Sequence, residues 1–103
     1  MSDSSAAEYV LVETQEPGGI LADALTLREQ GHPVRVYLVQ DAVHGAGRSV
    51  EALMDAGCVV LADDFSLAQR GLTPDDLTPS TRVASMAELA AELLDPAVRA
   101  VWH

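Results

Sequence analysis

Short apolar runs alternate along the chain with segments whose apolar residues recur at helical spacing. YVLVET at 9–14 is a β-rich apolar run that EPGG ends, and from Ile20 the apolar spacing becomes helical. Gly31 and Pro33 end that helix, and a second apolar run, VRVYLV at 34–39, follows. The first third of the chain therefore predicts a strand, a helix and a second strand.

The same alternation continues through the middle of the chain. QDAVHGAG at 40–47 predicts a glycine-bearing loop, and a short helix then ends at Gly57. CVVLA at 58–62 is an unbroken apolar run, which is typical of an interior strand covered by helices on both faces. A helix of about two turns follows and ends at Gly71.

Capping residues mark two helix starts in the last third. Thr73 before Pro74 predicts a helical first turn, because threonine caps well and proline fits the first helical position. Ser85 and Glu88 form a capping box, in which each side chain reaches the other residue's backbone amide. The apolar face of the helix that follows is expected to hold Met86, Leu89, Ala90 and Leu93.

The whole pattern predicts an α/β protein. TRVAS and AVRAVW supply the fourth and fifth strands, so strands and helices alternate throughout. Such alternation implies a mostly parallel sheet of about five strands in a single-domain, three-layer sandwich, because parallel strands need crossover helices. We expect residues 1–8 to be disordered and residues 9–103 to form the domain.

Charge excludes several classes of function. Sixteen acidic residues and six basic ones give a formal net charge of −10, which opposes binding to nucleic acid or to anionic membranes. All six basic residues are arginine, so lysine Schiff bases, the P-loop and a lysine general base are excluded. The start, MSDSSAAE, lacks the basic and apolar regions of a secretory signal, and no apolar run is long enough to span a membrane. We therefore expect a cytoplasmic protein.

Polar residues gather where the predicted strands end. Ligands of open parallel sheets bind beyond the carboxyl ends of the strands, and the loops at 14–19, 40–47 and 63–66 meet at that edge. The side chains expected on this rim are Glu16, Asp41, His44, Asp63 and Asp64.

These rim residues have structural and functional interpretations. Asp63 and Asp64 precede a helix, where a carboxylate caps backbone amides, although Ser66 could be the cap instead. They could also hold a ligand or a partner chain. Asp41, His44 and Asp63 together could form a metal site, but their spacing matches no metal motif.

Two further features, both in the segment that follows the second predicted strand, have weaker functional interpretations. His44 is the histidine best placed for acid–base chemistry, although an exposed loop histidine is usually not catalytic. GAGRS imitates half of a dinucleotide-binding fingerprint and could form a phosphate-binding turn with Gly45, Gly47 and Arg48. A flexible loop explains it better, because the third glycine and the acidic residue are missing.

The single cysteine, Cys58, excludes an internal disulfide and a CxxC motif. It opens the third strand, whereas Asp63 lies just past the far end, so roughly 16 Å separates them at about 3.3 Å per residue. No histidine or arginine adjacent in sequence would activate the thiol. We interpret Cys58 as a small buried hydrophobic residue.

Three segments of the chain follow one another in a recognisable order and spacing: VYLVQDAV, DAGCVVLADDFSLAQRGL with its helix closing in Arg70-Gly71-Leu72, and MAELAAELL before VRAVWH. Together they resemble the DsrE/DsrF-like family, the sulfur-relay group that includes the TusBCD-type subunits. The resemblance implies a small α/β sheet, assembly into trimers, hexamers or hetero-oligomers, and a persulfide cysteine at the end of the third strand. That position is Asp63 here, and a carboxylate cannot carry a persulfide.

The leading interpretation is therefore a non-catalytic oligomeric or partner subunit in sulfur transfer or sulfur metabolism. Its expected partners are copies of itself, related DsrE/F-like subunits and a sulfur-carrier protein, and no cofactor or metal is expected. Two alternatives stay open: a small-molecule enzyme or metal-binding protein that uses the rim, and an atypical sulfurtransferase that uses Cys58. The candidate binding residues are Asp41, His44, Asp63, Asp64, Phe65 and Arg70.

Overall fold

The computed structural model describes residues 7–15, 20–47, 50–78 and 80–102. Its strands are β1 (Glu8–Glu13), β2 (Val34–Leu38), β3 (Val59–Asp63), β4 (Arg82–Ala84) and β5 (Val98–Trp102). The α-helices are α1 (Ile20–Glu29), α2 (Glu51–Asp55), α3 (Asp64–Gln69) and α4 (Met86–Leu93), and two 3-10 helices are η2 (Gln40–Gly47) and η3 (Pro74–Asp76).

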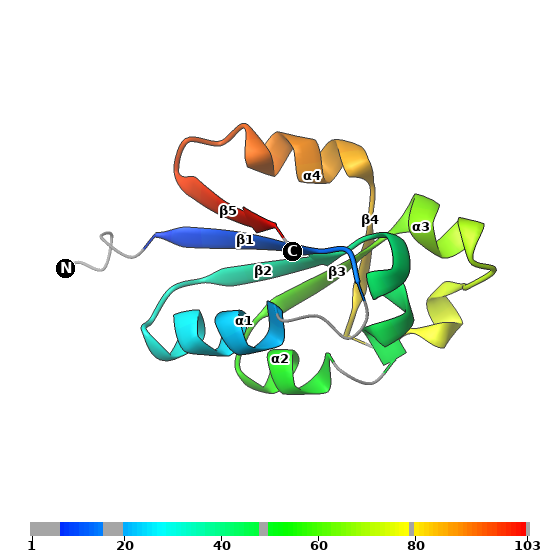
Figure 1. The fold of residues 1–103 in the computed structure, drawn as a ribbon, viewed down its shortest axis with the longest axis horizontal. Coiled ribbons are helices and arrows are strands. Elements are labelled where there is room, and N and C mark those ends of the chain that lie inside the picture. Colours follow the sequence, from blue (N-terminus) through cyan, green and yellow to red (C-terminus); the bar gives the residue numbers. More distant parts are fainter. Residues whose placement is uncertain (1–6, 16–19, 48–49, 79, 103) are drawn as a thin grey trace.

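The five strands form one sheet in the order β4-β3-β2-β1-β5, and every pair is parallel (Figure 1). The predicted single-domain α/β architecture with its parallel sheet is therefore confirmed. β1 begins at Glu8, one residue before the expected start of the domain. Of residues 1–8, which we expected to be disordered, Ala7 and Glu8 are described and residues 1–6 lie outside the described residues.

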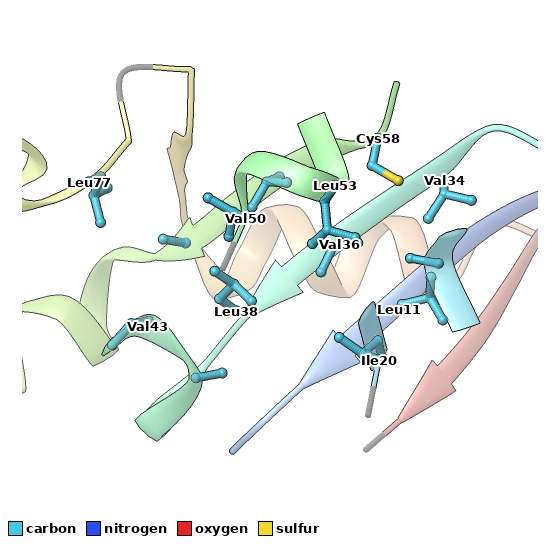
Figure 2. Packing of buried hydrophobic residues seen from close by; sticks show 14 of the residues in the cluster. Leu11, Ile20, Val34, Val36, Leu38, Val43, Val50, Leu53, Cys58 and Leu77 are labelled. Carbon is cyan, nitrogen blue, oxygen red and sulfur yellow. The ribbon is translucent and has the colours of Figure 1, made fainter. Parts of the chain in front are cut away.

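The two faces of the sheet are covered unequally. We call them the α1 face and the α4 face after the helices that pack on them. On the α1 face, residues of α1, α2, α3, η2 and the segment around Leu77 bury one large aliphatic cluster, part of which Figure 2 shows. On the α4 face, α4 packs on a smaller cluster built around Val10, Val12, Tyr37 and Leu61. Each fully buried valine or leucine contributes about 1.5–3 kcal/mol, so these clusters hold the layers together.

Most helix ends are where the sequence predicts them. Gly57, with a φ of 95°, adopts the left-handed conformation that ends α2, which a residue with a Cβ tolerates poorly. Ser85 accepts a hydrogen bond from the Glu88 amide at 3.2 Å, and the Glu88 carboxylate accepts one from the Ser85 amide at 3.2 Å. The predicted capping box at the start of α4 is confirmed.

Two expectations are wrong in detail. Residues 40–47 form η2 rather than an irregular loop, and the apolar side chains of Ala42 and Val43 in it are buried in the cluster of the α1 face. Met86 and Ala90 are exposed, because the single-helix layer turns only Leu89 and Leu93 toward the sheet. Within the described residues, no helix combines the length and the apolar character that a membrane span requires.

Candidate functional site

The carboxylate of Asp63 lies at the end of β3 and caps α3. One of its oxygens, Oδ2, accepts hydrogen bonds from the Ser66 amide at 2.8 Å and from the Ser66 hydroxyl at 2.6 Å. Only 3% of Asp63 is exposed. The predicted capping role therefore belongs to Asp63, while Ser66 is the residue that it holds.

Ser66 connects this cap to the neighbouring strand. Its hydroxyl oxygen accepts a hydrogen bond at 2.8 Å from the amide of Gln40, the first residue of η2. Gln40 has a φ of 52°, a left-handed conformation that costs a residue with a side chain about 1–2 kcal/mol. The chain of hydrogen bonds from Asp63 through Ser66 to Gln40 therefore fastens the end of β3 to the turn after β2.

Arg70 adds a second connection between α3 and η2. Its Nε and Nη2 atoms donate to Asp41 Oδ1 at 3.1 Å and 2.9 Å, and its Nη1 atom donates to the Ser66 carbonyl at 3.3 Å. The Asp41 side chain is largely exposed, so this ion pair contributes at most about 1 kcal/mol. Asp41 and Arg70, both predicted binding residues, thus neutralise one another.

The other candidate residues of this edge do not converge on one point. Asp64 and Phe65, in the first turn of α3, are exposed, and the exposed fraction of Phe65 is 62%. His44 is exposed on η2. Within the described ranges, no group of three or more His, Cys, Asp or Glu side chains is arranged to hold a metal ion. Glu16 and Arg48, two residues of the weaker hypotheses, lie outside the described residues.

One buried atom at this edge has no partner within the part of the chain that the structure describes. There Asp63 Oδ1 accepts no hydrogen bond, although the other oxygen of the same carboxylate accepts two. A buried polar atom without a partner costs about 1–3 kcal/mol. The site therefore offers a fixed carboxylate acceptor and no thiol, because the single cysteine of the chain, Cys58, lies elsewhere.

Glu13 is a buried polar residue that the sequence reasoning missed. It ends β1 and is 3% exposed. Its carboxylate accepts hydrogen bonds from the amides of Thr14 and Gln15 at 3.1 Å each, and from the amide of Ile20 at 3.2 Å. The available signal was its position, since Glu13, like Asp63, is an acidic residue between a buried strand and a helix.

Cys58 lies immediately before β3, at the opposite end of that strand from Asp63, as the sequence predicts. It is 6% exposed, and Figure 2 shows its sulfur among the aliphatic side chains of the α1 face, near Val34 and Leu53. Burial raises the pKa of the Cys58 thiol, and the nearby charge of Arg28 lowers it by less. The thiol therefore stays protonated and weakly reactive at neutral pH.

The proximity of Arg28 to Cys58 could not be foreseen from residues adjacent in sequence. Arg28 Nε donates to the Ala56 carbonyl at 2.9 Å, and Nη1 donates to the His32 carbonyl at 3.0 Å. Gly57 leaves room for this guanidinium, because a Cβ atom there would lie 2.9 Å from Arg28 Nη2. The arginine thus connects the ends of α1 and α2 at the amino edge of the sheet.

No protein-family model matches the chain, and no curated protein matches it either. Solved structures do share its fold. The ychN protein from E. coli aligns with a TM-score of 0.80 and 21% identity, over 94% of this chain and 99% of its own. A conserved protein of unknown function from Bacteroides thetaiotaomicron aligns with a TM-score of 0.71 and 12% identity, over 93% of this chain and 95% of its own.

A protein of unknown function from Methanobacterium thermoautotrophicum gives a TM-score of 0.73 and 17% identity, over 93% of this chain and 99% of its own. The three alignments span nearly the whole of each chain. The predicted DsrE/F-like α/β fold is therefore confirmed.

Proposed function

We propose that this chain is a DsrE/F-like subunit without persulfide chemistry of its own. In this proposal it works in the cytoplasm and assembles with copies of itself or with related DsrE/F-like subunits in sulfur transfer. A sulfur-carrier protein is the further partner that such an assembly would serve. The observation that carries the proposal is the place of Asp63 at the end of β3.

The geometry of Asp63 supports a structural role at the position where the family resemblance implies a persulfide cysteine. Both hydrogen bonds of its Oδ2 atom come from Ser66, one residue of the helix that Asp63 caps. A carboxylate oxygen cannot accept and release a sulfane sulfur as a thiolate does. The edge keeps the scaffold of a sulfur-transfer site and lacks its nucleophile.

Cys58 is a poor substitute for that nucleophile. Sulfur transfer needs an accessible thiolate, but Cys58 is almost fully buried and its pKa is raised by that burial. The whole length of β3 separates it from the edge where α3 begins. The carboxylate at the family's sulfur-carrying position and the buried thiol of Cys58 therefore support an accessory subunit rather than an autonomous sulfurtransferase.

The proposal is tested by exposing the folded protein to inorganic polysulfide and weighing the intact chain. We expect no stable adduct of about 32 Da on the wild-type protein. The same treatment in urea should label Cys58, which shows that the donor is competent, and Cys58→Ser should stay unlabelled in both conditions. An adduct on the folded wild type that disappears in Cys58→Ser would contradict the proposal and favour Cys58 as an atypical sulfur acceptor.

A further inference from the structure

The outer edge of β5 is an open strand edge. β5 has one strand neighbour among the described residues, β1, so one side of it carries backbone amides and carbonyls that pair with no strand. Proteins usually protect such edges with short strands, prolines or several charges. β5 is five residues long and contains one charged residue, Arg99, and no proline.

Three residues of β5 are exposed, Arg99, Ala100 and Trp102, whereas Val98 and Val101 are partly buried against the two core clusters. The side chains of Val98, Ala100 and Trp102 lie on the α4 face of the sheet. Ala100 and Trp102 pair with Val10 and Val12 of β1, whose side chains belong to the cluster on that face. Ala100 is exposed, and 56% of Trp102 is open to solvent. The Val98 amide donates to the Asp95 carbonyl at 3.1 Å. The strand therefore offers backbone groups that pair with no strand among the described residues, and an apolar row beside them.

From this edge we infer that β5 pairs in antiparallel fashion with β5 of a second copy of this chain, with Ala100 on the two-fold axis. This inference rests on the assembly role proposed above and names the surface that performs it. In that register Trp102 of each copy lies opposite Val98 of the other, an aromatic and β-branched pair of the kind that stabilises antiparallel strands. The two sheets then become one continuous sheet, with α4 of both copies on the same face.

Charge complementarity on the α1 face favours a second copy as the occupant. Val101 lines a groove of about 240 Å³ whose other wall includes Asp23 and Leu27 of α1. In the same register the partner's Arg99 lies opposite Val101, so its guanidinium reaches the groove that contains Asp23. β5 itself carries no acidic residue, although the chain as a whole has a net charge of −10.

The sole tryptophan reports on this contact directly. The oligomeric state of the wild-type protein is measured by native mass spectrometry and by Trp102 fluorescence at protein concentrations from roughly 1 µM to 1 mM. The salt is kept near 0.15 M, where repulsion between the two acidic copies is screened beyond about 8 Å. We expect a dimer, and we expect the emission maximum of Trp102 to move to shorter wavelength as the fraction of dimer increases.

Two sets of variants test the surface and the register. Ala100→Glu places two like charges opposite each other and should weaken dimerisation by about tenfold or more. Ala87→Glu, on the exposed side of α4, adds the same charge elsewhere and should leave the dimer unchanged. Arg99→Asp should weaken the dimer, and Arg99→Asp combined with Asp23→Arg should restore it.

Each contrary outcome overturns the inference. A wild-type monomer across the whole concentration range excludes pairing through β5. A dimer that survives Ala100→Glu uses another surface, and a double variant that stays monomeric excludes the stated register. Circular dichroism confirms that each variant is folded. Failure of the proposed function is seen separately, as a sulfur adduct on Cys58, and does not depend on these association measurements.

Discussion

Replacing Asp63 by alanine separates the structural role of this carboxylate from a role in binding a ligand. Asp63→Ala removes two hydrogen bonds to a charged group, each worth about 1.5–3 kcal/mol, and leaves the buried Ser66 hydroxyl without its acceptor. The same change removes the Oδ1 atom, which has no partner among the described residues, and so relieves about 1–3 kcal/mol. We expect a net loss of about 2–3 kcal/mol in the free energy of unfolding.

This loss is measured by urea denaturation followed by circular dichroism, with a reductant present to keep Cys58 a thiol. For a domain of this size the denaturant slope is about 1–3 kcal/mol per M, so the midpoint should fall by roughly 1 M. Asp64→Ala is the matched control, because Asp64 is the neighbouring carboxylate and is exposed. Loss of its favourable interaction with the helix dipole should cost under about 1 kcal/mol.

The reasoning is refuted if Asp63→Ala lowers the free energy of unfolding by less than about 0.5 kcal/mol. A carboxylate that can be removed so cheaply is not what holds α3 to the end of β3. Its burial at the carboxyl edge of the sheet would then need another reason, and the hypothesis that Asp63 binds a ligand would regain priority.

Three further predictions concern stability. Gln40→Gly should raise the free energy of unfolding by about 0.5–1 kcal/mol in urea, because glycine relieves the left-handed φ of 52° and keeps the amide that bonds Ser66; a loss of stability would contradict this. Gly57→Ala should destabilise the protein by about 1 kcal/mol more than Gly31→Ala, because both glycines have a positive φ but only a Cβ at Gly57 meets Arg28; equal midpoints in urea would show that Arg28 moves aside freely. The pKa of Tyr37 is raised above its ordinary 10.0, first by burial and then by the 2.7 Å hydrogen bond that its hydroxyl donates to Glu92. As the pH rises, the folded state therefore keeps this proton longer than the unfolded state does. The contribution to the free energy of unfolding should be full below about pH 10 and fall above it. When urea midpoints at about pH 9 and pH 11 are compared, the fall should be smaller in Tyr37→Phe than in the wild type.

The order of elements and the helix caps could be read from the sequence because they depend on local chemistry. Ser85 and Glu88 satisfy each other's backbone amides within one helical turn, whatever the rest of the chain does. Asp63 caps α3 for the same reason. The position of Cys58 at the amino end of β3 was likewise predictable, because it needs only the limits of one apolar run.

The candidate site was predicted less well, because its residues come from different strands. Asp41 and Asp63 were both expected on one rim, but their partners decide what they can do. Arg70 binds Asp41 from 29 residues away, and Ser66 joins Asp63 to Gln40. The role of Glu13 was missed, since its hydrogen bond to the Ile20 amide forms only when α1 folds back over β1.

By itself the sequence determined an alternating α/β chain whose β3 ends in a carboxylate where the family resemblance implies a thiol. The alternation of elements and the place of the carboxylate follow from side-chain periodicity and local capping, which a linear sequence contains in full, whereas the thiol is implied by the family resemblance alone. Only the tertiary structure decided that the carboxylate is enclosed by Ser66, that Arg28 lies near Cys58, and that β5 is left at an open edge. These features depend on the strand order and on contacts between residues distant in sequence, which form only when the layers pack in three dimensions.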